Sequence, residues 1–233
     1  MDSNIFSRLA APTEFYIIRH GQSEGNLAKI LQGRGEYPLS AAGRLQAAAR
    51  GRYFRDKFSA GQPEKALLFS SPQGRAKETA ELIAEETKLD APLYTDLLIE
   101  MQLGIWSGKV WNDVMTDPLW NDFRSRSWDA IPEAESSFAL FNRALNAWDF
   151  LQNAAAATSA KKVIVVTHGG FIQWLLKTTF QCRSWFPLFP ISNCGLFTLR
   201  VEPNPDNENP GLYWDEINSP VPNHSAENRG FPS

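Results

Sequence analysis

The sequence predicts an α/β fold: a three-layer α/β/α sandwich around a mostly parallel central sheet. Short apolar runs of strand length at 15–18, 66–69 and 163–166 alternate along the chain with longer segments of helical pattern. Strands that alternate with helices pair in parallel and are covered by helices on both faces. The 233 residues contain no internal repeat, and we expect one main domain over residues 1–201.

The expected helices take their bounds from caps and apolar spacing. Ser40 is a candidate N-cap for a helix that runs to about residue 58. The residues that we place at helical spacing in it are Leu45, Ala48, Ala49 and Arg52. Further helices are expected at about 74–88, 136–157 and 170–180, and residues 195–201 alternate like a fourth strand.

The segment 103–135 differs from the rest of the domain. Its tryptophans lie among polar residues, and two prolines interrupt it: Trp106, Trp111, Trp120, Trp128, Pro118 and Pro132. We expect short helices and loop laid over the sheet as a cap or insertion. The segment is either a lid or pocket wall, or a peripheral mini-core, and the sequence leaves both readings open.

The last part of the chain, residues 202–233, is rich in Pro, Asn, Asp and Glu. Such composition is typical of a tail or linker. The stretch 212–218, LYWDEIN, interrupts it and is a possible late edge strand. Beyond that stretch we expect little order, unless the tail packs on the body of the protein.

The bulk composition excludes several classes of partner. The net charge of −3 gives no global attraction to nucleic acid or to an anionic membrane, and no apolar run approaches the roughly 20 residues that span a bilayer. The N-terminus lacks the basic start and apolar stretch of a signal peptide. Cys182 and Cys194 are more typical of two reduced thiols than of a disulfide framework. A cytoplasmic location is the expectation.

Polar clusters follow three of the expected strands. Arg19, His20 and Asn26 follow the first, Arg75 lies in SSPQGRAKETA after the second, and His168 lies in THGG after the third. Ligands of open parallel sheets bind in the crevice outside the carboxyl ends of the strands. Helix N-termini at the same edge add backbone N–H donors and positive dipole ends.

The residue types in these clusters point to an anion. Two of the three histidines stand at strand-to-helix junctions beside glycines, and Arg19 and Arg75 occupy matching places. Arginine makes bidentate contacts with phosphate. Two guanidiniums and two imidazoles that converge on a helix N-terminus therefore indicate a site for a phosphoryl group.

Four stretches, in order, resemble the landmarks of a known family. They are RHGQSEGN, SSPQGRAKETA, LIEMQLGIWSG and VVTHGG. The set is similar to that of the histidine phosphatase superfamily, also called the phosphoglycerate mutase-like or RHG family. The resemblance runs from about Phe15 to Val201. It implies a phosphoglycerate mutase-like fold, with residues 1–201 as the catalytic domain.

The resemblance also implies a role for each matching residue. His20 matches the nucleophile that becomes phosphohistidine, and Glu100 matches the proton donor to the leaving group. The residues that match the phosphate and substrate contacts are Arg19, Asn26, Gln32, Gly33, Arg75, His168 and Gly169. We expect no cofactor and no metal. The expected partner is a small phosphate ester, and a homodimer is possible.

Elementary chemistry agrees with those residue types. Phosphoryl transfer needs an in-line nucleophile and compensation for the charge on three equatorial oxygens. A neutral imidazole attacks at pH 7 without losing a proton, because its reference pKa is about 6.5. Arg and His donors stabilise the transferring group, and a carboxylic acid can protonate the leaving alkoxide.

Several assignments have rivals in the sequence. Glu64, Glu78 and Asp96 compete with Glu100 for the role of acid. Asn26 is also a candidate cap of the first helix. Arg34, in the Gly33–Gly35 turn, is either a substrate contact or a solvated charge. A metal site built from the two histidines and Glu100 is disfavoured, because the neighbouring arginines would repel a cation.

The branch of the family is predicted from the stretch after the acid. The mutases of this family carry a longer insertion with paired arginines, whereas this chain has only Arg124 and Arg126 as a separated pair. The run 132–136, PEAES, resembles the phosphatase branch, although Ala134 replaces the usual Gly, and Glu36 stands where the family usually has Asp.

We therefore predict a phosphatase that hydrolyses a small or medium phosphomonoester. The tryptophans suggest a partly apolar or ring-bearing leaving group. The rival functions are a phosphoglycerate mutase-type phosphotransfer and a non-catalytic module that binds phosphorylated ligands through the same pocket.

Overall fold

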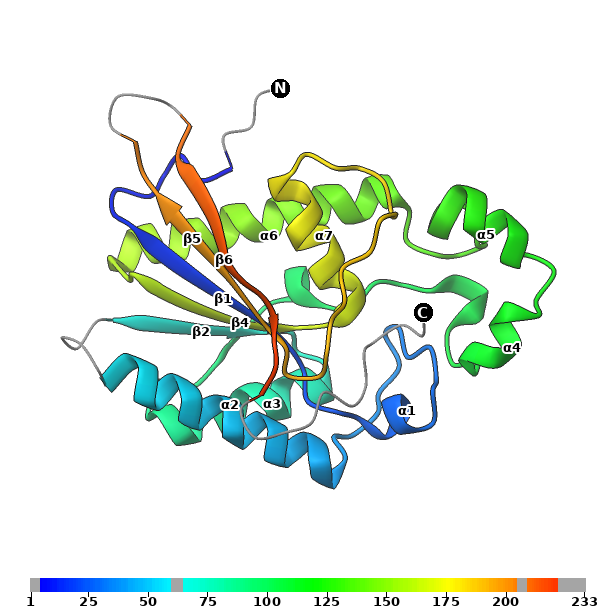
Figure 1. The fold of residues 1–233 in the computed structure, drawn as a ribbon, viewed down its shortest axis with the longest axis horizontal. Coiled ribbons are helices and arrows are strands. Elements are labelled where there is room, and N and C mark those ends of the chain that lie inside the picture. Colours follow the sequence, from blue (N-terminus) through cyan, green and yellow to red (C-terminus); the bar gives the residue numbers. More distant parts are fainter. Residues whose placement is uncertain (1–4, 60–64, 205–208, 222–233) are drawn as a thin grey trace.

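A single six-stranded sheet forms the centre of the molecule. The structure, a computed structural model, describes residues 5–59, 65–204 and 209–221 (Figure 1). Within these residues the strand order is β3-β2-β4-β1-β5-β6. The strands are β1 (Thr13–Arg19), β2 (Ala66–Ser70), β3 (Leu93–Tyr94), β4 (Lys162–Thr167), β5 (Leu196–Glu202) and β6 (Gly211–Ser219).

Most neighbouring strands run in parallel, and their ends are level. Strands β3, β2, β4 and β1 pair in parallel, while β5 is antiparallel to β1 and β6 is antiparallel to β5. In the register, Arg19 lies opposite Thr167 and Ser70 lies opposite Val166. The residues that follow β1, β2 and β4 therefore meet at one edge of the sheet, as predicted for a parallel arrangement.

Helices cover both faces of the sheet (Figure 1). Helices α2 (Ala41–Ser59) and α3 (Gly74–Thr87) lie on one face, and α6 (Ser137–Thr158) and α7 (Gly169–Thr179) lie on the other. Strand β1 alternates between them: Phe15 packs with the α6 and α7 side, and Tyr16 packs with the α2 and α3 side. Both strand faces are buried, so the run is continuously apolar. The predicted three-layer sandwich is confirmed.

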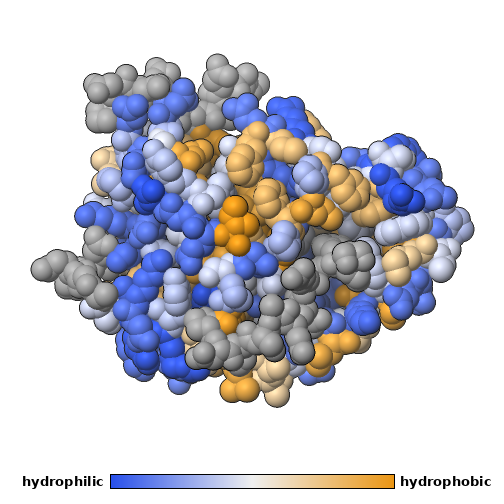
Figure 2. Space-filling model, viewed as in Figure 1, coloured by the Kyte–Doolittle hydropathy of each residue, from blue (hydrophilic) through white to orange (hydrophobic). Residues whose placement is uncertain are grey.

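The buried face of α2 is not the one that the apolar spacing indicated. Leu45 is 61% exposed, and the buried residues are Gly43, Ala47, Arg50, Gly51 and Phe54. Arg50 is buried because its guanidinium donates to the carbonyl oxygens of Cys194 (2.9 Å) and Ser219 (2.8 Å). Hydrophilic residues dominate the surface over α2, and apolar ones gather over α7 and the segment after it (Figure 2).

The Trp-rich segment folds into short helices beside the N-terminal end of α6. It contains η2 (Gly104–Trp106), α4 (Trp111–Met115), α5 (Trp120–Arg126) and η3 (Ser127–Ala130). The rings of Trp106 and Trp128 are buried and pack edge-on against Phe123, at centroid distances of 5.3 and 4.9 Å. This arrangement favours the mini-core reading over the lid. It removes the reason to expect a ring-bearing leaving group, because these rings face one another.

The C-terminal region contributes a strand to the sheet. Strand β6 pairs with β5 and occupies one edge, at the place of the possible edge strand 212–218. Little order was expected beyond residue 218, but Ser219 still belongs to β6 and Val221 is buried, 5% exposed, in the core on the α2 and α3 side. Residues 222–233 lie outside the described residues. Among the described helices, which also include α1 (Glu24–Leu27) and η1 (Asp96–Leu98), none is long and apolar enough to cross a bilayer.

Candidate active site

His20 is held in one orientation and one tautomer at the end of β1. It is 2% exposed, and its backbone N–H donates to the carbonyl oxygen of Thr167 (2.9 Å). Its Nδ1 lies 2.7 Å from the carbonyl oxygen of Gly21, and Arg75 Nε donates to its Nε2 (3.2 Å). A carbonyl only accepts, so Nδ1 carries the proton and Nε2 keeps a lone pair.

Both histidines of the site are neutral at pH 7. Burial lowers the pKa of His20 well below its usual value, and the charges of Arg75 and Arg19 lower it further. Burial likewise lowers the pKa of His168, again with Arg75 acting in the same direction. Desolvation and nearby cations both disfavour an imidazolium. His20 is therefore a neutral nitrogen base with a free lone pair.

Arg75 is fixed by backbone carbonyls from the turn after α1. Its Nη1 and Nη2 donate to the carbonyl oxygens of Gly35 and Gly33, both at 2.8 Å. Gly33 has a φ of +49°, a conformation that favours glycine. Glu36, in the same turn, accepts a hydrogen bond from Gly74 N–H (3.0 Å) at the start of α3. Arg75 is 1% exposed. The turn thus directs its buried guanidinium toward His20.

Arg19 and His168 each keep one buried nitrogen without a partner in the described residues. Arg19 Nη1 donates to the carbonyl oxygen of Ile191 (2.9 Å), and His168 Nε2 lies 2.8 Å from Ser71 Oγ. Arg19 Nε and His168 Nδ1 have no such contact. A Cβ on Gly169 would lie 3.3 Å from Arg19 Nε, so this guanidinium faces the start of α7. Buried polar atoms without partners call for an explanation such as a bound ion or ligand.

The ring of His168 lies beside that of His20. Their centroids are 5.2 Å apart. Burial lowers the pKa of Arg19 to about 10, while the negative charge of Glu100 opposes this shift, so Arg19 remains charged at neutral pH. Two cationic guanidiniums, of Arg75 and Arg19, and the neutral imidazole of His168 therefore lie near the ring of His20.

Glu100 lies at the N-terminus of α7, next to this cluster. Its Oε1 accepts hydrogen bonds from the N–H groups of Met101 (2.8 Å) and Phe171 (2.9 Å), and its Oε2 accepts one from Gly170 (3.0 Å). It is also the acid whose charge acts on Arg19 and on Arg75. The structure thus places Glu100 near Arg19 and Arg75, two of the residues predicted to bind phosphate.

The rival acids are placed differently. Glu78 pairs with Arg44 across the α2–α3 surface at 2.5 Å, and Asp96 is exposed in η1. Glu64 lies outside the described residues. Neither described rival is among the charges that act on Arg19.

Asn26 and Gln32 both form hydrogen bonds at the start of the first helix. Asn26 and Ser23 form a capping box at the start of α1, and Asn26 Oδ1 also accepts from Asn193 Nδ2 (3.1 Å). Gln32 Oε1 accepts from Ser23 Oγ (2.8 Å). The capping reading of Asn26 therefore holds. The side-chain nitrogen of Asn26 is the group that this residue could offer to an anion.

Sequence reasoning missed three polar residues of the site. Ser71 contacts His168, as described above. Gln73 accepts from Glu100 N–H (2.7 Å) and reaches the carbonyl oxygen of Gly33 (3.4 Å). Asn193 donates to the carbonyl oxygen of His20 (3.3 Å). Ser71 and Gln73 lie inside the SSPQGR motif, so the motif itself carried a signal; Asn193 had none.

The described residues contain no group of three or more His, Cys, Asp and Glu side chains placed to hold a metal ion. Cys182 and Cys194 are unpaired.

Comparison with known proteins identifies the family. The sequence model of the histidine phosphatase superfamily (branch 1) matches residues 15–207. Phosphatase PhoE of Bacillus subtilis, named as uncharacterized, is 30% identical over 164 residues, which cover 70% of this chain and 76% of PhoE. A metal-independent phosphoserine phosphatase of Arabidopsis thaliana is 31% identical over 177 residues, covering 74% and 71%. A probable phosphoglycerate mutase, GpmB of Proteus mirabilis, is 30% identical over 197 residues, covering 82% and 86%.

A solved structure shares the fold. Mycobacterial glucosyl-3-phosphoglycerate phosphatase, in complex with VO3, superimposes with a TM-score of 0.73 at 23% identity, covering 89% of this chain and 99% of that one. This likeness bears on the fold alone, whereas the family model and the relatives bear on descent. The chain therefore belongs to the histidine phosphatase superfamily and is an enzyme of the histidine phosphatase type, as the order of its four motifs predicted.

Proposed function

We propose that the protein hydrolyses a small or medium phosphomonoester through a phosphohistidine formed on His20, with Glu100 as the proton donor. One observation carries the proposal. The Nε2 lone pair of a buried, neutral His20 faces Arg75, in a cluster where Arg19 Nε and His168 Nδ1 are buried without partners among the described residues. A phosphoryl group would accept hydrogen bonds from Arg75, Arg19 Nε and His168 Nδ1, while the lone pair of His20 Nε2 stays available for attack.

In the first step the residues of the cluster hold the phosphoryl oxygens. Arg75 Nε exchanges its hydrogen bond with His20 for one with a phosphoryl oxygen, which frees the nucleophile. The bond from Nε2 to phosphorus then forms as the phosphorus–oxygen bond to the leaving group breaks. Gly21 C=O accepts from Nδ1–H and stabilises the positive charge that develops on the imidazole.

Glu100 serves the leaving group. In its protonated form it gives a proton to the departing oxygen, which requires the carboxyl group to turn one oxygen away from the α7 N-terminus. In the second step the carboxylate takes a proton from water, which attacks phosphorus. The phosphorus–nitrogen bond breaks, and inorganic phosphate and neutral His20 are released.

The relatives support hydrolysis and keep one alternative open. Two of them are named as phosphatases, and the Arabidopsis protein is named as metal-independent and as acting on phosphoserine. The Proteus relative is named as a probable phosphoglycerate mutase, so phosphotransfer to a second hydroxyl is the second candidate. A cytoplasmic location and a homodimer stay predictions; the two unpaired cysteines fit the former.

The test is phosphate release from a panel of phosphomonoesters with chelator present, including phosphoserine and both phosphoglycerates, with isomer formation followed in parallel. We expect release that disappears in His20→Ala. Isomer formation without free phosphate would establish the mutase instead. Binding of phosphate without turnover of any ester would contradict both and favour a binding module.

A further inference from the structure

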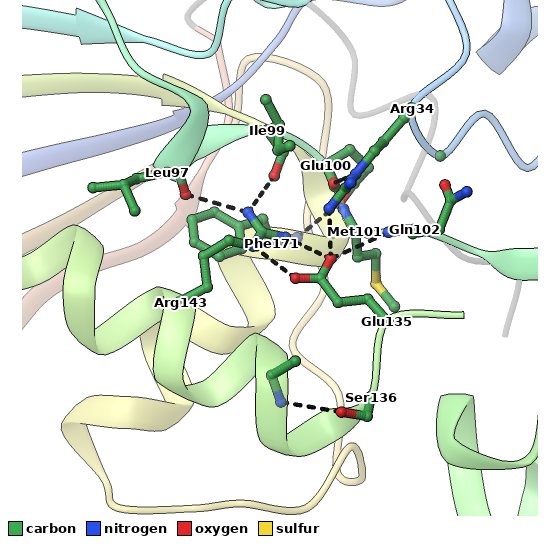
Figure 3. A network of polar contacts seen from close by, with 12 residues as sticks. Arg34, Leu97, Ile99, Glu100, Met101, Gln102, Glu135, Ser136, Arg143 and Phe171 are labelled. Carbon is green, nitrogen blue, oxygen red and sulfur yellow. Dashed lines mark hydrogen bonds and ion pairs between the residues drawn. The ribbon is translucent and has the colours of Figure 1, made fainter. Parts of the chain in front are cut away.

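The loop that carries Glu100 is held by a side-chain network outside the phosphate cluster (Figure 3). At its centre is Glu135, just before α6. Arg143 Nε donates to Glu135 Oε1 (2.8 Å) and Arg143 Nη2 donates to Oε2 (3.0 Å). Such a bidentate pair is geometrically well defined. Both side chains are largely buried, with 13% and 12% of their surface exposed, so solvent screens the pair less than a surface ion pair.

Arg143 contacts two neighbours of Glu100, the backbone that precedes it and Phe171. Its Nη1 donates to the carbonyl oxygens of Leu97 (3.2 Å) and Ile99 (2.7 Å), in the stretch that leads into Glu100. Its guanidinium also lies over the Phe171 ring, 4.0 Å from the centroid. Phe171 is the residue whose N–H donates to Glu100 Oε1. Arg143 therefore fixes both the backbone before the acid and a donor to its carboxylate.

Arg34 completes the network from the opposite side. Its Nη2 donates to Glu135 Oε2 (3.1 Å), and its Nε donates to the carbonyl oxygen of Glu100 (3.3 Å). The same turn supplies the carbonyls of Gly33 and Gly35 that hold Arg75. The turn 33–35 therefore contacts both Arg75, which lies next to His20, and the backbone of Glu100.

We propose that Arg34 and Glu135 are positioning residues for Glu100: their ion pair fixes the distance and direction between the acid and the phosphate cluster, without contacting the transferring group. This inference rests on the proposed function. It replaces both readings that the sequence left for Arg34, a substrate contact and a solvated charge, because the hydrogen bonds of this side chain go to Glu135 and to the backbone carbonyl oxygen of Glu100.

The proposal predicts a selective effect. Losing the Arg34 contacts lets the acid drift, and a displacement of about 1 Å can cost up to about 10²-fold in rate. Esters with poor, alkyl-type leaving groups need the acid, whereas p-nitrophenyl phosphate scarcely does. We expect Arg34→Gln to lower kcat on an alkyl phosphate about tenfold and on p-nitrophenyl phosphate less than about twofold, with KM changed little on either.

The experiment compares Arg34→Gln with Arg52→Gln, a matched control. Arg34 is 43% exposed and pairs with Glu135 at 3.1 Å; Arg52 is 47% exposed and pairs with Glu86 at 3.0 Å, on the α2–α3 surface. The control should leave both rates unchanged. Glu135→Gln, a second variant of similar shape, should repeat the selectivity of Arg34→Gln, and thermal unfolding checks that each variant is folded.

A double-mutant cycle with Glu100→Gln then separates the possible roles. If Arg34 acts through the acid, Arg34→Gln adds less than about twofold to the loss in a Glu100→Gln background. Equal losses on both esters, or a rise in KM that is additive with Glu100→Gln, would overturn the inference. Selectivity in Glu100→Gln but none in Arg34→Gln would overturn the inference alone, and no selectivity in Glu100→Gln would overturn the assigned acid and the inference with it.

Discussion

The two halves of the candidate site are built in different ways. On the phosphate side, Arg19, His20, Arg75 and His168 are between 0% and 7% exposed and stand at strand ends or at a helix start. Their partners are mostly backbone carbonyls. On the acid side, Glu100 lies on a loop that depends on ion pairs, one of them with the half-exposed Arg34. The phosphoryl group is the same in every ester, so the phosphate side can be rigid. The leaving group varies between esters, and the acid side, which serves it, lies on loops.

Replacing the nucleophile tests the rigid half and should give the largest effect. His20→Ala removes the nitrogen that forms the covalent bond, and we expect turnover to fall by at least about 10⁴-fold. Phosphoenzyme, measured by label transferred from substrate, should also be absent. Circular dichroism checks that the fold is retained. Activity near that of the unaltered protein would place the chemistry elsewhere.

Replacing Glu100 tests the acid side. Glu100→Gln keeps the size of the side chain but cannot supply a proton. The loss on an alkyl phosphate should be about 10²–10³-fold, since general acid catalysis contributes in that range, and the loss on p-nitrophenyl phosphate should be several times smaller or absent. Steady-state rates on the two esters measure the difference. Equal losses would mean that the proton donor is another group.

A third variant sharpens the account of the phosphate side. His168 Nδ1 can donate to a phosphoryl oxygen only if Nε2 is the acceptor, so Ser71 Oγ must donate to Nε2. Ser71→Ala removes that donor, and we expect phosphate affinity, measured by inhibition, to fall about fivefold, the equivalent of one net hydrogen bond of about 1 kcal/mol. A serine away from the site offers a matched control: Ser125→Ala, in α5, where Ser125 Oγ donates to the carbonyl oxygen of Asp122 (3.0 Å) on the exposed surface, should leave the inhibition constant unchanged. Unchanged affinity in Ser71→Ala would show that the tautomer is set in another way.

The same contrast explains what the sequence could and could not predict. Arg19, His20, Arg75 and His168 were predictable because apolar strands and helix starts fix their positions, and the parallel topology brings those positions to one edge. The contact between Ser71 and His168 joins residues 97 positions apart, and it depends on the register of two strands. Glu135 and Arg143 were not singled out, because their role comes from where α6 packs. The buried face of α2 was misassigned because Arg50, a polar residue, donates to carbonyl oxygens far along the chain, those of Cys194 and Ser219.

The last prediction concerns how stability depends on pH, and it tests the burial of the phosphate side. The pKa values of His20 and His168 are lowered by folding, so below pH 6.5 the unfolded chain binds protons that the folded protein does not. The contribution of these histidines to the free energy of unfolding is therefore fully present above about pH 6.5. It falls as the pH drops from there toward the pKa values of the folded protein, by at most about 1.4 kcal/mol per pH unit for each histidine. Urea unfolding of the unaltered protein and of His20→Ala, at several pH values between 7.5 and 5, measures this. The variant lacks one of the two groups, so its free energy of unfolding should decline less steeply with acid, whatever constant offset the lost packing adds. Parallel curves would mean that folding does not lower the pKa of His20, and would remove the argument that His20 is kept a neutral nucleophile by its surroundings.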